Sequence, residues 1–423
     1  MNTDSRIDSF CRTAFLRLRP GAVRNNVRIL LSCVRQAART GCKVLSLPEP
    51  AIQGGSCGAL SDHPAVRDAV DTGRRAFENG VKRLKKAPKI VWTETDGRWM
   101  LPVIAQAGPD PRLPFCGSPA AVFERQVYGF ARRLAAIGMP GAVIGLSGGL
   151  DSALALLVTV AAFDLLQMDR ARIVVLTMPG FGTTKRTRGN AELLAEGLGL
   201  TLETVDITAA CRQHLKDIGH PPDLFDVTFE NAQARERTQI LMDKANQTGG
   251  IVVGTGDLSE IALGWSTYNG DHMSMFAVNA GVPKTAVREV CSWWAEQHPG
   301  KAAEALLDIL ATPVSPELVP AKRGQITQKT EEKIGPYELH DFFLWHFIAE
   351  GKTRAEMRAA ARAAFRGRYP ASVIDAWLTV FFNRLFSQSF KRNCAPDAVP
   401  VYRVFFSPET WRIPSDMAGA DLF

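Results

Sequence analysis

The residues with the clearest chemical potential are the serines and the aspartate of a short glycine-rich turn. The stretch 143–152 changes from apolar residues to a Ser-Gly-Gly turn at Ser147, and Asp151 and Ser152 follow. Glycines let the main chain approach an anion closely, and free N–H groups at the start of a following helix point toward it. The carboxylate of Asp151 would repel phosphate unless a cation lay between them. The turn indicates a phosphate site with a cation at Asp151, and its phosphate donors would be Ser147, Gly148, Gly149 and Ser152.

The same turn has a second interpretation, an ordinary glycine turn between a strand and a helix. It lacks the Gly-Lys-Ser/Thr ending of the common phosphate loops of kinases and related enzymes. Because short glycine motifs are weak signals, the turn by itself leaves both interpretations open.

A second candidate site lies in the glycine-rich turn after a later apolar stretch. There Thr255 could hydrogen-bond a nucleotide, whereas Asp257 and Ser259 are more simply explained as caps of the next helix. Glu260 would lie on the first turn of that helix. Mg²⁺ is usually held by one or two carboxylates together with substrate phosphates. We therefore predict that Asp151 and Glu260 share a magnesium ion.

Three further segments carry polar side chains that a ligand could use. Residues 264–273 are turn-rich and aromatic, which suggests a loop wrapped around a ligand. Lys284 could stabilise charge on a transferring phosphoryl group, with an ordinary surface lysine as the alternative. Asn231, Arg235 and Thr238 share one helix face and could face either a ligand or solvent.

The elements that must position these residues alternate between strand and helix patterns. Such alternation is typical of an α/β fold with a parallel, doubly wound sheet, whose ligands lie beyond the carboxyl ends of the strands. Both glycine-rich turns lie at such ends. The predicted strands are 172–178, 201–205 and 250–253, in addition to the stretch before Ser147, and the predicted helices are 121–136, 188–198 and 229–247.

The remaining segments predict a helical C-terminal region and a separate N-terminal part. Helices are expected at 354–365 and 372–391. The dipole of the second helix would favour the cations Lys391 and Arg392 at its C-terminal end, whatever their function. The Pro-rich, then charged stretch 313–333 predicts a mobile loop. Near the N-terminus the pattern predicts a helix at 26–40 and a strand at 43–47.

Length and composition predict two domains in a cytoplasmic protein. The chain has 423 residues, and glycines and prolines crowd into 106–119, which is typical of a linker. A net charge of +7 is mild, so it fits small anionic substrates without requiring nucleic acid. No stretch is long and apolar enough to span a membrane. The eight cysteines form no Cys-x-x-Cys pair, which argues against zinc-ribbon, iron–sulfur and dithiol sites.

Residues 141–416 resemble the synthetase domain of the glutamine-dependent NAD⁺ synthetases, which belong to the ATP pyrophosphatase superfamily. Several long motifs in the same order make this resemblance more specific than the glycine-rich turn alone. The motifs span 146–152, 228–235, 250–260, 264–275, 278–285, 334–343, 386–392 and 411–416.

The resemblance implies an activity and a set of site residues. The family adenylates the carboxylate of nicotinic acid adenine dinucleotide with ATP, releases pyrophosphate, and lets ammonia displace AMP to give NAD⁺. By this resemblance Asp151 and Glu260 bind Mg²⁺, Lys284 lies near the reacting phosphates, and Thr255 contacts ATP. It also implies pyrophosphate contacts at Ser147, Gly148, Gly149 and Ser152, ATP contacts at Lys391 and Arg392, and dinucleotide contacts at Asn231, Arg235, Trp265 and Asp271.

The first 105 residues resemble only the beginning of the nitrilase-like glutaminase domain of these relatives. Glu49 aligns with the glutamate of the glutaminase Glu-Lys-Cys triad, but no segment resembles its lysine or cysteine motif, and Cys57 and Cys116 lie in other contexts. A general base without its nucleophile cannot hydrolyse glutamine by covalent catalysis. We therefore expect an inactive, truncated glutaminase remnant at 1–105, a linker at 106–119 and a synthetase domain at 120–423.

The same resemblance sets expectations about partners. Free ammonia would supply the nitrogen, with a separate glutaminase as the other source. Half of a layered domain leaves an apolar face uncovered, so we expect self-association or a partner.

Two other functions stay open at this point. One is an amide ligase of the same chemistry that acts on another carboxylate, although residues 264–285 resemble the dinucleotide side of the family. The other is a non-catalytic subunit of an active synthetase or glutaminase, although Asp151, Glu260 and Lys284 are all present.

Overall fold

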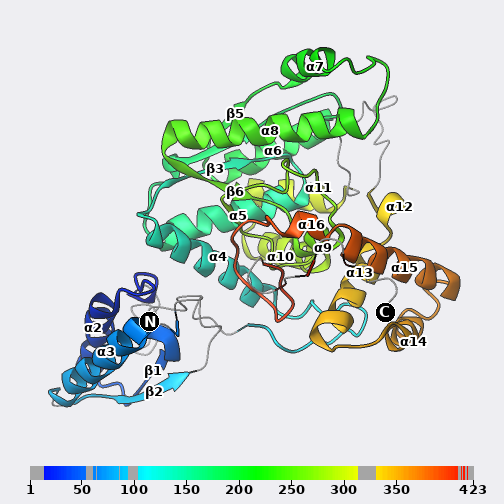
Figure 1. Cartoon of the computed structure of the whole chain (residues 1–423). Helices are drawn as coiled ribbons and strands as arrows, with labels where there is room; N and C mark the ends of the chain where they lie inside the picture. Colours follow the sequence, from blue (N-terminus) through cyan, green and yellow to red (C-terminus); the bar gives the residue numbers. More distant parts are fainter. Residues whose placement is uncertain are drawn as a thin grey trace. The chain divides into compact units, whose positions relative to one another are not determined.

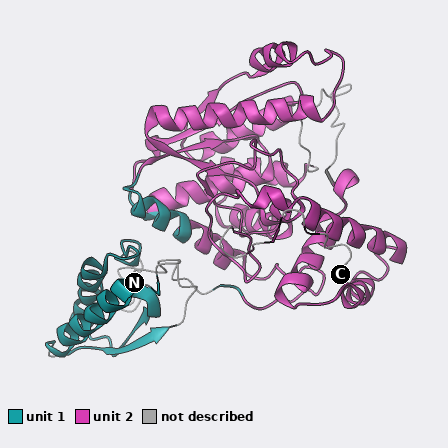
Figure 2. Ribbon diagram, viewed as in Figure 1, with its two compact units in different colours: residues 1–104, 128–139, 165–167 teal, residues 105–127, 140–164, 168–423 magenta. Residues whose placement is uncertain are grey.

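The computed structural model divides the chain into two compact units (Figure 2). Unit 1 comprises 1–104, 128–139 and 165–167, and unit 2 comprises 105–127, 140–164 and 168–423. Among the described residues, no helix combines the length and hydropathy needed to cross a bilayer. The structure describes residues 14–53, 61–62, 64–84, 86–93, 103–312, 330–407, 411, 413–414 and 417.

Unit 1 contains a small parallel sheet covered by two helices (Figure 1). Strand β1 (Val44–Pro48) pairs with β2 (Lys89–Thr93), and the helices are α2 (Val23–Arg39) and α3 (Pro64–Lys82). Apolar residues at helical spacing along α2 pack against α3 and the sheet and form a core. The predicted helix 26–40 and strand 43–47 are confirmed, whereas α3 and β2 were not predicted. The core includes Val23, Val27, Leu30, Val34, Leu47 and Phe77.

Unit 2 is built on a parallel five-stranded sheet of order β5-β4-β3-β6-β7. The chain enters at β3 (Gly141–Gly145), moves outward through β4 (Ile173–Thr177) and β5 (Leu202–Thr204), and returns to β6 (Gly250–Gly254) on the other side of β3. The strand order therefore reverses between β3 and β6, and doubly wound sheets bind ligands at such a switch point. The predicted α/β class with a parallel sheet is confirmed.

Helices cover the sheet on both faces, with α8 (Val227–Thr248) above it and α5 (Leu150–Leu165) below it in Figure 1. Helix α5 is buried along nearly its whole length because its sequence is apolar on all sides. The predicted helices and strands of this region are confirmed, with ends that differ by at most three residues. The other elements are α4 (Pro119–Ala136), α6 (Lys185–Gly197), α7 (Thr208–Asp217), α9 (Leu258–Leu263), β7 (Phe276–Ala277), α10 (Lys284–Gln297) and α11 (Lys301–Leu310).

The C-terminal part of unit 2 is helical, as predicted, but one helix is interrupted. The expected helix 372–391 is two elements, α15 (Ala371–Ser387) and α16 (Ser389–Arg392), which meet at Gln388. Of the expected loop 313–333, residues 313–329 lie outside the described residues, and the remainder includes α12 (Thr330–Ile334). The other helices are α13 (Tyr337–Leu344) and α14 (Arg354–Ala364).

Burial of His340 makes the stability of unit 2 depend on pH. The side chain is 1% exposed in an aromatic cluster with Phe343 and Phe381, and its Nε2 donates to the Ile334 carbonyl. Burial lowers the pKa of His340 to about 4. Between about pH 6.5 and 4 the unfolded chain therefore binds a proton there that the folded chain does not.

We expect the wild-type protein to lose about 3 kcal/mol of stability relative to His340→Gln as the pH falls from 7 to 4. Glutamine keeps a donor for the Ile334 carbonyl but does not titrate. Urea unfolding of both proteins at several pH values measures this difference, and parallel curves across that range would contradict it.

Candidate active site

A cavity of about 960 Å³ lies at the carboxyl ends of β3 and β6. The loops that follow these two strands meet there, as the topology requires. Two of the residues predicted for the synthetase site, Lys284 and Arg392, do not line the cavity. The residues that do are Ser147, Gly148, Gly149, Asp151, Ser152, Asn231, Arg235, Thr255, Glu260, Trp265, Asp271 and Lys391.

The glycine-rich turn between β3 and α5 is braced by its own two serines. The hydroxyls of Ser147 and Ser152 are 3.0 Å apart, and Ser152 also donates to the Gly149 carbonyl at 3.0 Å. The backbone N–H of Gly149 donates to Ser147 Oγ at 3.2 Å. The turn thus presents main-chain and hydroxyl groups to the cavity in front of a helix N-terminus, which is the arrangement that binds anions.

Only glycine fits at position 148. Its φ is +81°, and an added Cβ would lie 2.0 Å from the carbonyl oxygen of Thr187 on α6. The close approach of α6 and the left-handed backbone both exclude a side chain.

We expect Gly148→Ala to destabilise the protein by at least about 2 kcal/mol, because left-handed strain and a backbone clash add together. Gly189→Ala on α6 is the matched control: no atom lies within 4 Å of its Cβ position, so it should stabilise by about 0.5–1 kcal/mol. Thermal unfolding measures both changes. Equal effects of the two substitutions would show that the contact with Thr187 does not constrain the turn.

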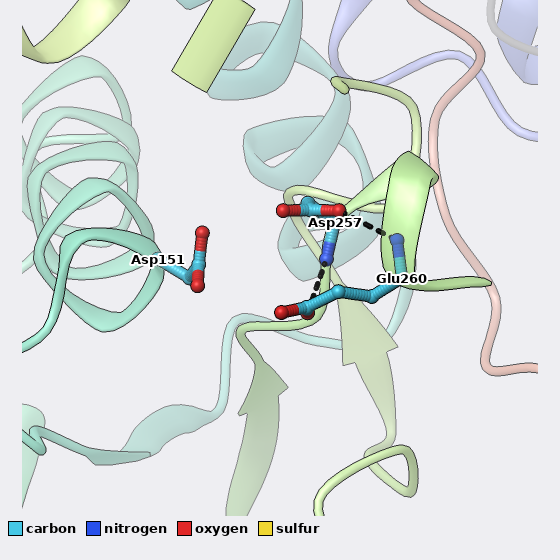
Figure 3. A group of neighbouring side chains, drawn as sticks. All are labelled: Asp151, Asp257 and Glu260. Atoms are coloured by element: carbon cyan, nitrogen blue, oxygen red, sulfur yellow. Dashed lines mark hydrogen bonds between the residues drawn. The ribbon is translucent and has the colours of Figure 1, made fainter. Parts of the chain in front are cut away.

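Three carboxylates converge next to this turn, from Asp151, Asp257 and Glu260 (Figure 3). One oxygen of each lies within 4.8 Å of the others. Asp151 is on the first turn of α5, whereas Asp257 and Glu260 belong to the loop after β6 and to α9. The loops of two strands at the switch point therefore build one acidic cluster.

Lys284 neutralises part of this charge from behind. Its Nζ lies 2.6 Å from Asp151 Oδ2, 2.7 Å from Asp257 Oδ2 and 3.0 Å from Glu260 Oε1. The side chain is 2% exposed, so the alternative of an ordinary surface lysine is wrong. Burial lowers the pKa of Lys284, but the three carboxylates outweigh it and hold the pKa well above its usual value. The lysine is charged at neutral pH.

Three carboxyl groups face a single ammonium group, and burial disfavours the ionised forms of Asp257 and Glu260. Burial and the neighbouring Asp151 raise the pKa of the Asp257 carboxyl, against the attraction of Lys284. Asp151 Oδ1 is buried and has no hydrogen-bond partner among the described residues. Three hard oxygen donors and an unpaired buried oxygen fit a divalent cation such as Mg²⁺. Asp151 and Glu260 lie together as the sequence predicts, and Asp257 joins them.

The residues around α9 correct the predicted caps. Asp257 Oδ1 does cap α9 through the Glu260 N–H at 2.8 Å, but its other oxygen contacts Lys284. Ser259 does not cap α9. Its hydroxyl donates to the buried carboxylate of Asp341 on α13 and accepts from the backbone N–H of Lys284. Burial raises the pKa of Asp341 to about 6. Asp341 lies within the motif 334–343, but its partners Ser259 and Thr285 are distant in the sequence, so its role in the site was missed.

The segment 264–273 forms one wall of the cavity. Its Thr267 hydroxyl donates to Asn231 Oδ1 at 2.7 Å, and Arg235 Nε donates to the Tyr268 carbonyl at 3.3 Å. Asp271 accepts from the Thr267 N–H at 2.7 Å. The polar face of α8 therefore borders the cavity, and it is not an isolated solvated face.

Cations from the C-terminal helices hold this segment. Lys391 Nζ donates to the carbonyls of Gly264 and Ser266 at 2.8 and 2.7 Å, and Arg384 lies 5.2 Å from the ring of Trp265. Arg392 is 4% exposed and donates to the Ala262 carbonyl at 2.8 Å. Arg392 therefore fastens α16 to α9 and is not brought into the cavity.

Glu49, which resembles the glutamate of the glutaminase triad, lies in unit 1. Glu49 begins the short helix η1 (Glu49–Ala51), directly after β1, and is exposed. Cys57 lies outside the described residues, and Cys116 is a buried free cysteine of unit 2.

The chain is similar to known proteins in sequence and in fold. The sequence model described as NAD synthase matches residues 122–366. The glutamine-dependent NAD(+) synthetase of Mycobacterium tuberculosis is 42% identical over 323 residues, which cover 70% of this chain and 47% of that protein. The enzyme of the same name from Thermotoga maritima is 31% identical over 299 residues, covering 69% of this chain and 47% of that protein. This chain thus spans about half the length of these relatives.

Solved structures show the same fold. The structure of a glutamine-dependent NAD(+) synthetase from Cytophaga hutchinsonii superposes with a TM-score of 0.70 at 15% identity, covering 96% of this chain and 97% of that one. With the family match over more than half of the chain, and with the glycine-rich turn and acidic cluster inside it, the chain belongs to the NAD synthase family.

Proposed function

We propose that this chain amidates nicotinic acid adenine dinucleotide to NAD⁺ with ATP, through an adenylated intermediate, and releases AMP and pyrophosphate. The observation that carries the proposal is the meeting of the glycine-rich turn with the acidic cluster of Asp151, Asp257 and Glu260 at one cavity. Adenylation needs a site that binds pyrophosphate and a site that neutralises the charge developing as pyrophosphate leaves. The glycine-rich turn would supply the first, and the acidic cluster with a bound cation would supply the second.

In this proposal the glycine-rich turn binds the pyrophosphate part of ATP. On binding, the Gly149 N–H and the hydroxyls of Ser147 and Ser152 would exchange their hydrogen bonds within the turn for hydrogen bonds to phosphate oxygens, and Thr255 would contact the nucleotide from the loop after β6. Most of the rate comes from placing the two anionic substrates together in a site with preorganised charge.

Asp151, Asp257 and Glu260 would hold Mg²⁺, which neutralises phosphate charge when it is bound. Lys284 opposes the effect of burial on the carboxyl pKa values and holds these carboxylates in place from behind. Because its Nζ already contacts all three carboxylates, Lys284 acts on the reaction through them.

The dinucleotide would lie along the wall formed by α8 and the segment 264–273. Asn231, Arg235, Trp265 and Asp271 border the cavity there, and Lys391 fixes the segment by its carbonyls. This side carries both hydrogen-bonding groups and an aromatic ring, which suit a nucleotide with a pyridine carboxylate.

Ammonia is the nitrogen source in this proposal. The curated relatives carry names that state glutamine dependence, but in this sequence only Glu49 resembles the glutaminase triad. Glu49 is exposed on η1. The division into a glutaminase remnant at 1–105, a linker at 106–119 and a synthetase domain at 120–423 stays a prediction, as do self-association and a separate glutaminase.

The test is a single assay of the purified chain. AMP and NAD⁺ are measured with ATP, Mg²⁺ and nicotinic acid adenine dinucleotide, in parallel with ammonium and with glutamine, and Asp151→Asn serves as the inactive control. Product with ammonium alone supports the whole proposal. Equal rates with glutamine would overturn the nitrogen source. AMP formed only with other carboxylates would favour a related amide ligase, and no product with any would favour a non-catalytic subunit.

A further inference from the structure

A single buried amide lies between the two loops that build the site. Asn279 follows β7 and is fully buried. Its Nδ2 donates one hydrogen to the carbonyl of Asp151 at 2.8 Å and the other to the carbonyl of Thr255 at 3.1 Å. Asp151 belongs to the helix after β3, and Thr255 to the loop after β6. One side chain therefore joins the phosphate side of the site to the nucleotide side.

The orientation of this amide is set by a second one. Gln126 on α4 is 1% exposed, and its Nε2 donates to Asn279 Oδ1 at 2.9 Å and to the Val278 carbonyl at 3.0 Å. Because carbonyl oxygens only accept, the Gln126 nitrogen must face Val278, and the Asn279 oxygen must then face Gln126. Both hydrogens of Asn279 are left for the two loops.

We propose that Asn279, oriented by Gln126, is a positioning residue that sets the separation between Asp151 and the loop after β6. This inference rests on the proposed function, since it concerns the loops assigned to ATP and its cation. Asn279 does not border the cavity, and it acts through the backbone on which Asp151, Thr255 and Glu260 are mounted. Misplacing reacting groups by about 1 Å can lower a rate by about 100-fold.

The decisive variant is Asn279→Asp, which keeps the shape but turns a donor into an acceptor. A carboxylate oxygen would then face the carbonyls of Asp151 and Thr255 and push the loops apart. We expect kcat to fall by about 100-fold and the Mg²⁺ concentration for half-maximal activity to rise by about 10-fold, as with other residues that orient metal ligands. The KM for the dinucleotide, which binds along another wall, should change by less than about 3-fold.

A binding measurement provides a readout besides activity. Mn²⁺ binding is followed by electron paramagnetic resonance in the presence of a non-hydrolysable ATP analogue. We expect about 10-fold weaker binding in Asn279→Asp than in the wild type. Unchanged Mn²⁺ binding together with an unchanged Mg²⁺ requirement would overturn the proposal.

Two further variants separate positioning from folding. Gln233→Glu is the matched control, because Gln233 is also fully buried and bonds two backbone groups, those of Phe181 and Phe229, away from the cavity lining. It should lower thermal stability as Asn279→Asp does, without altering Mn²⁺ binding. Gln126→Met frees the Asn279 amide but leaves both loop contacts possible, so it should weaken Mn²⁺ binding less than Asn279→Asp does.

If Asn279→Asp does not fold, Gln126→Met decides the proposal by the same two measurements. A shift of the Mn²⁺ affinity in Gln233→Glu equal to that in Gln126→Met would show a general loss of packing, and the positioning role would be rejected. Failure of the proposed function is distinguishable, because the wild type would then form no NAD⁺ while the Mn²⁺ titrations still compare the variants.

Discussion

Asp151→Asn should lower kcat for NAD⁺ formation by about 1,000-fold while the chain stays folded. Asp151 contacts Lys284 through Oδ2, and its buried Oδ1 has no hydrogen-bond partner among the described residues. The amide keeps the shape of the side chain but removes the charge that a cation needs. The free energy of unfolding should change little, because Lys284 keeps its contacts with Asp257 and Glu260. Loss of one negative charge also relieves repulsion within the acidic cluster.

The measurement is steady-state AMP and NAD⁺ formation at saturating Mg²⁺, with thermal unfolding as a check on folding. Asp164→Asn is the matched control on the same helix, because Asp164 lies at the other end of α5 in an exposed pair with Arg170. The control should keep wild-type activity. If Asp151→Asn kept more than a tenth of the wild-type rate, Asp151 would not hold a required cation.

Lys284→Met should destabilise the protein by about 3–5 kcal/mol, since it leaves three carboxylates without their buried cation. The methylene chain of methionine fills similar space, so the loss reports the charge and not a cavity. The loss should be smaller at pH 5 than at pH 8, because protonation of the carboxylates then relieves their repulsion. Millimolar Mg²⁺ should recover part of the stability, since a divalent cation can take over the neutralising role.

Urea unfolding at the two pH values, with and without Mg²⁺, measures these effects. Lys301→Met is the control, because Lys301 pairs with Glu196 at 2.5 Å on the surface, with both side chains about 60% exposed. Exposed pairs contribute about 0–1 kcal/mol, so this change should be small and insensitive to Mg²⁺. A loss of under about 1 kcal/mol for Lys284→Met would mean that the three carboxylates are largely protonated in the native protein.

The cavity walls could be predicted from sequence because their signals are local. The alternation of strand and helix patterns indicated the parallel sheet, and the turn at Ser147 indicated a phosphate site at its edge. A left-handed Gly148 and a helix N-terminus involve only residues close in the sequence, and Gly148 indeed has φ of +81°. Which residues pair across the site was not local information.

Burial was the property that sequence patterns misjudged. Lys391 and Arg392 are adjacent, yet one borders the cavity and the other is buried against the Ala262 carbonyl. The interruption of the predicted helix 372–391 at Gln388 places them in a separate short helix, α16. A cation at a helix end has the same sequence signature in both settings, because the helix dipole favours it in each.

The sequence by itself determined the fold class, the family, and the positions of the two loops that build the site. These follow from hydrophobic periodicity and short motifs, which depend on neighbouring residues. Only the tertiary structure decided that Lys284 is buried among three carboxylates, that Asp257 is one of them, and that Asn279 joins the two loops. Lys284 and Asp151 are 133 residues apart in the sequence. Their contact depends on how the loops after β3 and β6 pack against α10, because burial and pairing energies arise only when distant segments exclude water together.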